Sequence, residues 1–503
     1  MKIKSKNRLL TNMLTYAILQ IVNMLVGLFL PRLYLSVYGS EVNGVVSTIN
    51  SFTTYFSYLE AGLGLTLIHS LFKPLAENDF DSTNGILSYS KKQYHKISFV
   101  YLILVVALSL TFPFLKITND IGRVEFIFLV LVIGLYGAID FYSMAKYRVL
   151  LTADRKEYVI SNAMILAQVL RFVFVWILLQ FNLSIVFVKI VPIFTLFIRS
   201  IVLRIYISKK YPKCNFSTNS DINVSFSKNR WDALLLQISI STSISLPTIV
   251  VSQVLGYREA NVFAVYCLVV CSLISLTSAL SSGVAPMLGR AISQGKNINS
   301  TYEIFDFIVA VIISIVFSIT VIMLLPFVKL YTNVVDDINY IHPSYALLMS
   351  IWGALHVYRI PVTAVINAAG IYRENRVNNI ANLLIQIVGL IIGAVLFGIK
   401  GVIVVMIIAS LHRNISLTKV NNNVLLHFNL KKCLLYQLLI TIVIVSSFAI
   451  SYNIISNIEF SICKWILIAV VVSVIEILIN VIVFSVINSK TTKKIFEKIK
   501  TKT

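Results

Sequence analysis

The sequence predicts an all-α membrane protein with about fourteen transmembrane helices, built as two six-helix bundles in the same orientation followed by two further helices. Three observations predict this fold: apolar stretches of spanning length, an alternation of basic residues between successive gaps, and weak similarity between the two halves. Of the 503 residues, 58% are hydrophobic and only 13% are charged. No segment has the composition of a soluble domain.

The apolar stretches are close to the roughly 20 residues that an α-helix needs to cross a bilayer. The expected helices cover residues 10–34, 43–70, 97–115, 124–145, 159–181, 183–205, 233–255, 260–286, 305–331, 344–369, 378–397, 401–412, 434–452 and 465–487. The first follows a basic N-terminal segment, as a signal peptide does, but it is too long and lacks a small-residue cleavage site. We therefore expect it to remain as a helix. The twelfth is unusually short.

Basic residues indicate the orientation of these helices. With a cytoplasmic N-terminus, 32 of the 43 Lys and Arg residues fall in cytoplasmic segments, seven in outside gaps and four within helices. The positive-inside rule then places both termini in the cytoplasm, and a bacterial cytoplasmic membrane is the expected location. The net charge of +22 is expected to hold anionic membrane lipid. No nucleic acid partner is expected.

The two halves carry short related segments. Residues 151–162, before the fifth helix, resemble residues 367–378, before the eleventh, at an offset of 216 residues. Such a relation predicts parallel repeats about an axis along the membrane normal. The expected divisions are a bundle at 1–208, a cytoplasmic linker at 209–231, a second bundle at 232–420, two added helices at 421–488 and a basic tail at 489–503.

The loops and motifs favour a carrier over an enzyme. Every outside gap is short, which disfavours a membrane glycosyltransferase or polymerase, because these enzymes usually hold their acceptor in a folded external loop. The segment from Gly289 to Lys296 has one residue too many between its glycines for a P-loop, and Asn297 replaces the Ser or Thr that binds magnesium. The histidines show no metal-ligand spacing, and no cofactor is expected.

Polar stripes mark four helices as candidates for lining a water-filled cleft. They are the first helix with Gln20 and Asn23, the second with Thr53, Ser57 and Glu60, the seventh with Gln237, Ser241, Ser245 and Thr248, and the eighth with Ser275, Ser278 and Ser282. The alternative is that these small residues only pack helices closely. Clustering at matching places in the two halves favours the cleft.

Charged residues inside the helices are the strongest functional signal. A central charge costs about 2.5–3.5 kcal/mol on insertion scales, so it persists where it faces a cavity or a partner. Arg171, Arg359, Glu60 and Glu476 lie deep in their predicted helices. Glu476 is expected to order helix packing.

Other charges admit two interpretations. Lys189 and Arg199 lie nearer to helix ends, so they either line the cavity or extend to the membrane interface. Asp140 is a possible ion-pair partner of Arg171, which would make both residues structural. Arg32 and Arg290 are expected at the cavity rim.

A cleft with this basic bias attracts anions, because low-dielectric walls focus the field of each guanidinium. Pyrophosphate suits paired Arg forks better than Lys. The candidate substrate-binding residues are Arg171, Arg359, Arg32, Arg290, Lys189, Arg199, Asn23 and Gln237. Glu60 and Asp140 are candidates for coupling to H⁺ or Na⁺, or for salt bridges.

Several segments resemble one transporter family. They are PRLYLSVYGSEVNGVVS at 31–47, LEAGLG at 59–64, KPLA at 73–76, LLTADRKEYV at 150–159, AAGIY at 368–372 and FGIKG at 397–401. They resemble the Wzx-type flippases of polysaccharide repeat units, in the multidrug/oligosaccharidyl-lipid/polysaccharide (MOP) exporter superfamily, and the likeness extends over essentially the whole chain.

The resemblance implies a MATE-like core of two bundles and a cationic cleft lined largely by helices one, two, seven and eight. It also implies alternating access that moves an undecaprenyl-pyrophosphate-linked oligosaccharide to the outer leaflet for capsule, O-antigen or wall polysaccharide. A polysaccharide polymerase and chain-length proteins are the candidate protein partners. A lipid II flippase and a multidrug or small-molecule ion antiporter of the same superfamily are the alternatives.

Overall fold

The fold is described from a computed structural model. The structure describes residues 2–60, 63–115, 121–216, 230–278, 288, 291–292, 294, 298–369, 371, 373–424, 430–455, 458, 461–489 and 491–492. The chain divides into two compact units, an N-terminal unit of Met1–Ile238 and a C-terminal unit of Ser239–Thr503. The finer division predicted from the sequence, with a linker at 209–231, stays a prediction.

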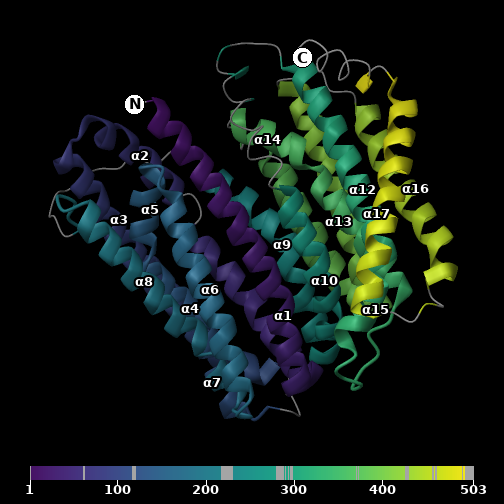
Figure 1. The fold of residues 1–503 in the computed structure, drawn as a ribbon, viewed down its shortest axis with the longest axis horizontal. Coiled ribbons are helices and arrows are strands. Elements are labelled where there is room, and N and C mark those ends of the chain that lie inside the picture. The colour runs from purple at the N-terminus through teal and green to yellow at the C-terminus, as the bar shows by residue number, and fades with distance from the viewer. Residues whose placement is uncertain are drawn as a thin grey trace. The chain divides into compact units, whose positions relative to one another are not determined.

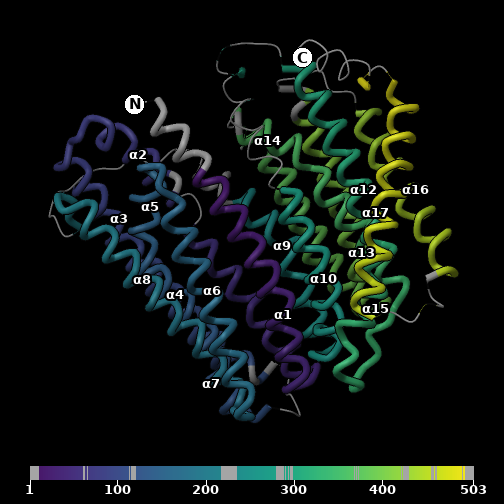
Figure 2. Tube along the Cα trace, in the orientation of Figure 1, coloured from purple at the N-terminus to yellow at the C-terminus, as the bar shows by residue number. Residues whose placement is uncertain are grey.

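The N-terminal unit is entirely helical over its described residues (Figures 1 and 2). Its elements are α1 (Lys2–Ser57), the 3₁₀ turn η1 (Tyr58–Glu60), α2 (Leu63–Glu77), α3 (Phe80–Leu115), α4 (Arg123–Ser143), α5 (Ala145–Ala153), α6 (Glu157–Leu179), α7 (Ile185–Val188) and α8 (Val191–Lys210). Helix α6 packs between α1 and α8, and α3 packs on α4. The short helices α2 and α5 lie at one end of the unit and α7 at the other (Figure 1).

The C-terminal unit repeats this order of long and short helices. Its elements are α9 (Arg230–Val254), which begins before the unit boundary, α10 (Tyr257–Ser278), α12 (Asn299–Thr332), α13 (Pro343–Tyr358), α14 (Ile360–Ala369), α15 (Arg376–Val424), α16 (Leu430–Ile455) and α17 (Ile462–Ile487). The added helices α16 and α17 pack on α12. On this face Asn480 of α17 accepts a 2.5 Å hydrogen bond from Ser314 and donates to the buried Glu476.

Twelve described helices are long and apolar enough to cross a membrane. Two of them, α1 and α15, each contain a sharp turn at a glycine of positive φ, Gly39 (φ 76°) and Gly398 (φ 59°). Glycine alone adopts such a conformation without strain. Division at these turns gives fourteen spanning segments in the described chain, which confirms the predicted all-helical membrane fold.

Four of the six positive-φ positions among the described residues also follow the internal repeat. Gly256 (φ 122°), between α9 and α10, lies 217 residues after Gly39. Gly398 lies 216 residues after Asn182, which has a φ of 50° and ends the turn after α6. Asn is one of the few residues that tolerate this region. Equivalent turns therefore recur at the offset that relates residues 151–162 to 367–378.

The twelfth spanning segment differs from its prediction. Residues 399–424 continue α15 well beyond the expected end at residue 412. Polar residues lower the hydropathy there, but Arg413 and Asn414 are buried in the protein. Asn414 Nδ2 donates to the carbonyl oxygen of Leu355 at 2.9 Å and to Gln437 Oε1 at 3.2 Å. Neighbouring helices thus bond the side-chain nitrogen of Asn414, and protein rather than lipid surrounds this part of the helix, which therefore continues.

Gly401→Ala is expected to destabilise the protein. A Cβ at Gly401 would lie 2.1 Å from the backbone oxygen of Gly393, across the turn of α15, and such overpacking costs about 1–3 kcal/mol. Gly27→Ala in α1 is the matched control, because its Cβ would meet nothing within 4 Å and Ala favours a helix by up to about 1 kcal/mol. Thermal unfolding in detergent measures the stability of the two variants, and Gly401→Ala is expected to melt at the lower temperature. Equal melting temperatures would contradict the close approach of Gly401 to Gly393.

Candidate functional site

Three neighbouring cavities in the N-terminal unit meet at Arg171 of α6. Their volumes are about 310, 300 and 90 Å³, and Arg171 lines all three. Lys189, at the end of α7, lines the two larger cavities, and Arg199 of α8 lines the smallest. The larger volumes lie at the lower end of the range typical of ligand pockets.

The cavity walls are rich in uncharged hydrogen-bonding groups. From the two parts of α1 come Asn23, Asn43, Ser47, Asn50, Thr53, Thr54 and Ser57, and from other helices come Tyr101, Tyr136, Gln168 and Thr195. Gln168 Nε2 donates to Asn23 Oδ1 at 3.0 Å, which joins α6 to α1. Amide and hydroxyl groups of this kind suit a hydroxyl-rich ligand.

The acidic residues near the cavities are engaged by other arginines. Asp140 of α4 accepts a 2.8 Å hydrogen bond from Arg148 of α5 and forms a close ion pair with Arg199. Arg148 also lies 3.6 Å from Glu60, and Tyr94 donates to Glu60 at 2.7 Å. The alternative that Asp140 pairs with Arg171 is therefore not what the structure shows.

Arg171 and Lys189, by contrast, have no acidic partner in the described part of the chain. The Lys189 side-chain nitrogen lies 3.5 Å from the centroid of the Tyr34 ring, a cation–π arrangement that supplies no negative counter-charge. Arg171 Nε and the Tyr34 hydroxyl are buried without a hydrogen-bond partner. An anionic oxygen in the cavity would satisfy these donors.

The interface interpretation of Lys189 and Arg199 does not match their burial, because the residues are only 6% and 5% exposed. Both point their charge into the protein rather than extending to the membrane surface. Each residue lines a polar cavity and has a partner there, Tyr34 for Lys189 and Asp140 for Arg199. Such a setting lowers the cost of a basic residue inside the membrane.

The remaining predicted residues lie elsewhere. Arg359 ends α13 and contacts His356 at 2.6 Å; it lines none of these three cavities. Arg32 is partly exposed beside Pro31, which lines the largest cavity. Gln237 is exposed on α9. Arg290 lies outside the described residues.

Sequence reasoning missed Arg148 and Tyr34. Arg148 falls in a segment expected to be a cytoplasmic loop, because nine-residue α5 is too short and too polar to stand out as a spanning helix. Tyr34 lies at the end of an apolar stretch, so the sequence marks it as a lipid-facing or packing residue. In the structure its ring contacts the Lys189 side-chain nitrogen, and no spacing pattern in the sequence indicates this contact.

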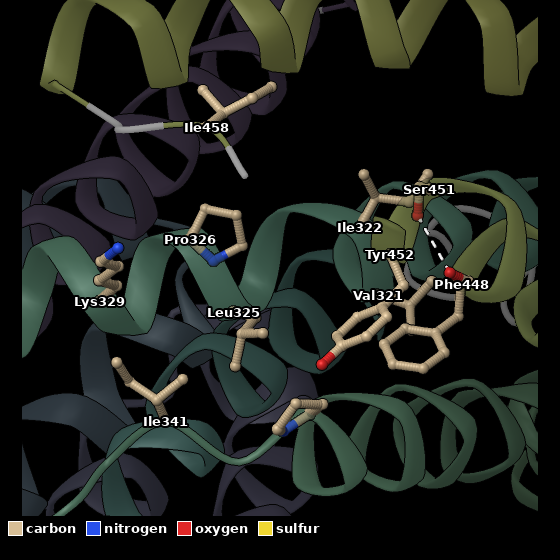
Figure 3. Close-up of a pocket in the computed structure, with 11 residues that line it drawn as sticks. Val321, Ile322, Leu325, Pro326, Lys329, Ile341, Phe448, Ser451, Tyr452 and Ile458 are labelled. Atoms are coloured by element: carbon tan, nitrogen blue, oxygen red, sulfur yellow. Dashed lines mark hydrogen bonds between the residues drawn. The ribbon is translucent and has the colours of Figure 1, made fainter. Parts of the chain in front are cut away.

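A fourth cavity, in the C-terminal unit, has a different character (Figure 3). It has a volume of about 170 Å³ and lies against α12, α16 and the start of α13. Leu325, Pro326, Phe448 and Tyr452 form its largely apolar wall, and Lys329 is the single charged residue that lines it. It lacks the converging polar groups of the cavities around Arg171.

Comparison with known proteins supports the fold. No protein-family model and no curated protein matches the sequence. Among solved structures, the lipid II flippase MurJ in an inward closed conformation superimposes with a TM-score of 0.65 and 14% identity, covering 93% of this chain and 98% of MurJ. The chain has the fold of the MOP superfamily transporters.

Two further structures agree with this assignment of the fold. An inward-facing multidrug resistance MATE family transporter of the MOP superfamily has a TM-score of 0.57 and 15% identity, covering 80% of this chain and 99% of that one. A MOP superfamily transporter from Pyrococcus furiosus, described by the reverse polarity of its binding pocket, has a TM-score of 0.52 and 14% identity, covering 84% and 95%. The narrower resemblance to Wzx-type flippases stays a prediction.

Asp140→Asn is expected to destabilise the protein by about 3 kcal/mol, because it leaves two guanidiniums without their shared carboxylate in a largely buried setting. Glu60→Gln is the matched control. Its partner Arg148 lies 3.6 Å away and Tyr94 can still donate to the amide oxygen, so the expected loss is below about 1 kcal/mol. Unfolding in detergent distinguishes the two, and an equal loss for both would refute the central role of Asp140.

Proposed function

We propose that the protein is a flippase that moves an undecaprenyl-pyrophosphate-linked oligosaccharide across the bacterial cytoplasmic membrane, with both termini in the cytoplasm. The observation that carries this proposal is the pair of unbalanced cations, Arg171 and Lys189, in a polar cavity inside a membrane-spanning unit. The polysaccharide made from the exported unit would be capsule, O-antigen or wall polysaccharide.

The chemistry of such a substrate fits the cavity. A sugar chain and a pyrophosphate cannot cross hydrocarbon, whereas the polyprenyl tail remains in lipid, so the carrier need shield only the polar head. The Arg171 fork matches phosphate oxygens, and the Asn, Gln, Ser and Thr groups beside it match sugar hydroxyls. Multidrug antiporters remain an alternative, but an unbalanced positive cavity repels cationic drugs.

Alternating access is the proposed mode of movement. MATE structures of the same fold have been obtained in inward-facing and outward-facing conformations. Glu60 is the stronger candidate for coupling to H⁺ or Na⁺, because Asp140 is already held by two guanidiniums whereas Glu60 has one hydroxyl donor and one longer contact with Arg148. This coupling belongs to the proposal.

A lipid II flippase is the second candidate function. Lipid II also presents a sugar on undecaprenyl pyrophosphate, and MurJ shares the fold over 93% of this chain. The two functions differ in the pathway that they serve.

Deletion of the gene is expected to abolish a surface polysaccharide and to cause accumulation of its lipid-linked repeat on the cytoplasmic side. Mass spectrometry of the lipid-linked intermediates and staining of the polysaccharide measure this directly. Accumulation of lipid II with cell lysis would favour the peptidoglycan role instead. Intact polysaccharide with drug hypersensitivity would exclude both flippase functions in favour of an antiporter.

Arg171→Ala and Lys189→Ala are expected to lower export by about tenfold or more while leaving membrane insertion unchanged, because a hydrogen bond to a charged group contributes about 1.5–3 kcal/mol. Arg171→Lys is expected to recover only part of the activity, since it keeps the charge but loses the fork. Arg204→Ala, at an exposed position of α8, is the control. Export is measured in cells complemented with each variant. Equal export by all four variants would show that Arg171 and Lys189 do not bind the substrate.

A further inference from the structure

The C-terminal unit contains a second buried guanidinium without a counter-charge. Arg413 of α15 is only 3% exposed. Its Nη1 donates to the hydroxyl of Ser239 on α9 at 2.6 Å, while its Nε and Nη2 atoms have no hydrogen-bond partner. It forms no ion pair with any acid in the described part of the chain. A neutral hydroxyl does not balance this charge, and an unpaired buried charge is costly.

The neighbouring helix adds further positive charge. Helix α13 packs against α15, and Arg413 acts electrostatically on both His356 and Arg359. Arg359 Nη2 lies 2.6 Å from His356 Nε2. Because a guanidinium can only donate, His356 Nε2 must accept, so this imidazole is neutral with its proton on Nδ1. The pair therefore contributes one positive charge and no negative one.

Unbonded amide groups lie at the same place. Asn379 is fully buried, and both Nδ2 and Oδ1 of its side chain lack a partner. Its backbone oxygen lies 3.5 Å from the Ser239 hydroxyl that Arg413 also contacts. The two residues that contact this one hydroxyl, Arg413 and Asn379, thus carry three unbonded N–H donor atoms, two on Arg413 and one on Asn379. Buried donors left unpaired each cost about 1–3 kcal/mol.

We propose that the C-terminal unit binds a small monovalent inorganic anion, chloride in the cell, on Arg413 and Asn379 between α9 and α15. One such ion neutralises the guanidinium and accepts from the unbonded donors. Both residues are almost fully buried, so the site suits a small ion rather than a lipid headgroup. The ion ties α9 to α15, and it is independent of the transported substrate.

The test is the melting temperature of the purified full-length protein in detergent, titrated with sodium chloride against sodium gluconate at constant ionic strength and pH. Wild type is expected to show a saturable upward shift of about 2–4 °C with chloride alone. Arg413→Gln keeps hydrogen-bonding groups but removes the charge, and the chloride shift is expected to disappear. Arg204→Gln, which removes a charge at an exposed position of α8 outside both proposed sites, is the matched control and is expected to keep the full shift.

Asn379→Asp provides a second route if Arg413→Gln does not fold. The proposal places the new carboxylate in the same ion site as Arg413, where it would replace the ion, so the variant is expected to lose the chloride response and to melt higher than wild type in gluconate. Equal melting of wild type in chloride and gluconate would overturn the proposal. So would a chloride shift that survives in Arg413→Gln or in Asn379→Asp, or one that is lost in Arg204→Gln.

Discussion

The ion pairs of Asp140 determine the character of the cavity in the N-terminal unit. A carboxylate inside a lipid-embedded bundle requires a partner, and Asp140 takes two, Arg199 from α8 and Arg148 from α5. These pairs hold α4, α5 and α8 together. They also occupy the carboxylate of Asp140, which lines the same cavity as Arg171 and Lys189, so these two basic residues remain available to a ligand. The same contacts therefore stabilise the unit and make its cavity positive.

Both units use the same backbone plan but carry different polar interiors. The order of long and short helices repeats, and the turns at Gly39 and Gly256, and at Asn182 and Gly398, recur at nearly one offset. The N-terminal unit encloses polar cavities around Arg171. In the C-terminal unit, the described polar residues around Arg413 are packed closely, with several amide groups left unbonded. We interpret the first as a substrate site and the second as a site for a bound ion.

Much of this fold could be predicted from the sequence because a spanning helix needs a long apolar stretch, and fourteen such stretches are visible. That Arg171 faces a cavity could also be predicted, since charges inside apolar stretches are costly. For Lys189 and Arg199 the sequence allows two interpretations, and the structure places both beside a cavity. Which basic residues pair with Asp140 could not be predicted. Arg148 lies on a helix too short to recognise by periodicity, and Asp140 had more than one basic residue within reach. Arg413 was not predicted as an intramembrane residue because the low hydropathy around it indicated the end of a helix. The helix continues there because protein, not lipid, surrounds this residue.

The central claim is that Arg171 and Lys189 form an anion site for a lipid-linked pyrophosphate. The most direct measurement is the affinity of the purified protein for a short-chain isoprenyl pyrophosphate, compared between wild type and the Arg171→Ala, Lys189→Ala double variant. Saturable binding to wild type, weakened by salt and at least about tenfold weaker in the double variant, is the expected result. Equal affinity of the two proteins would contradict the account.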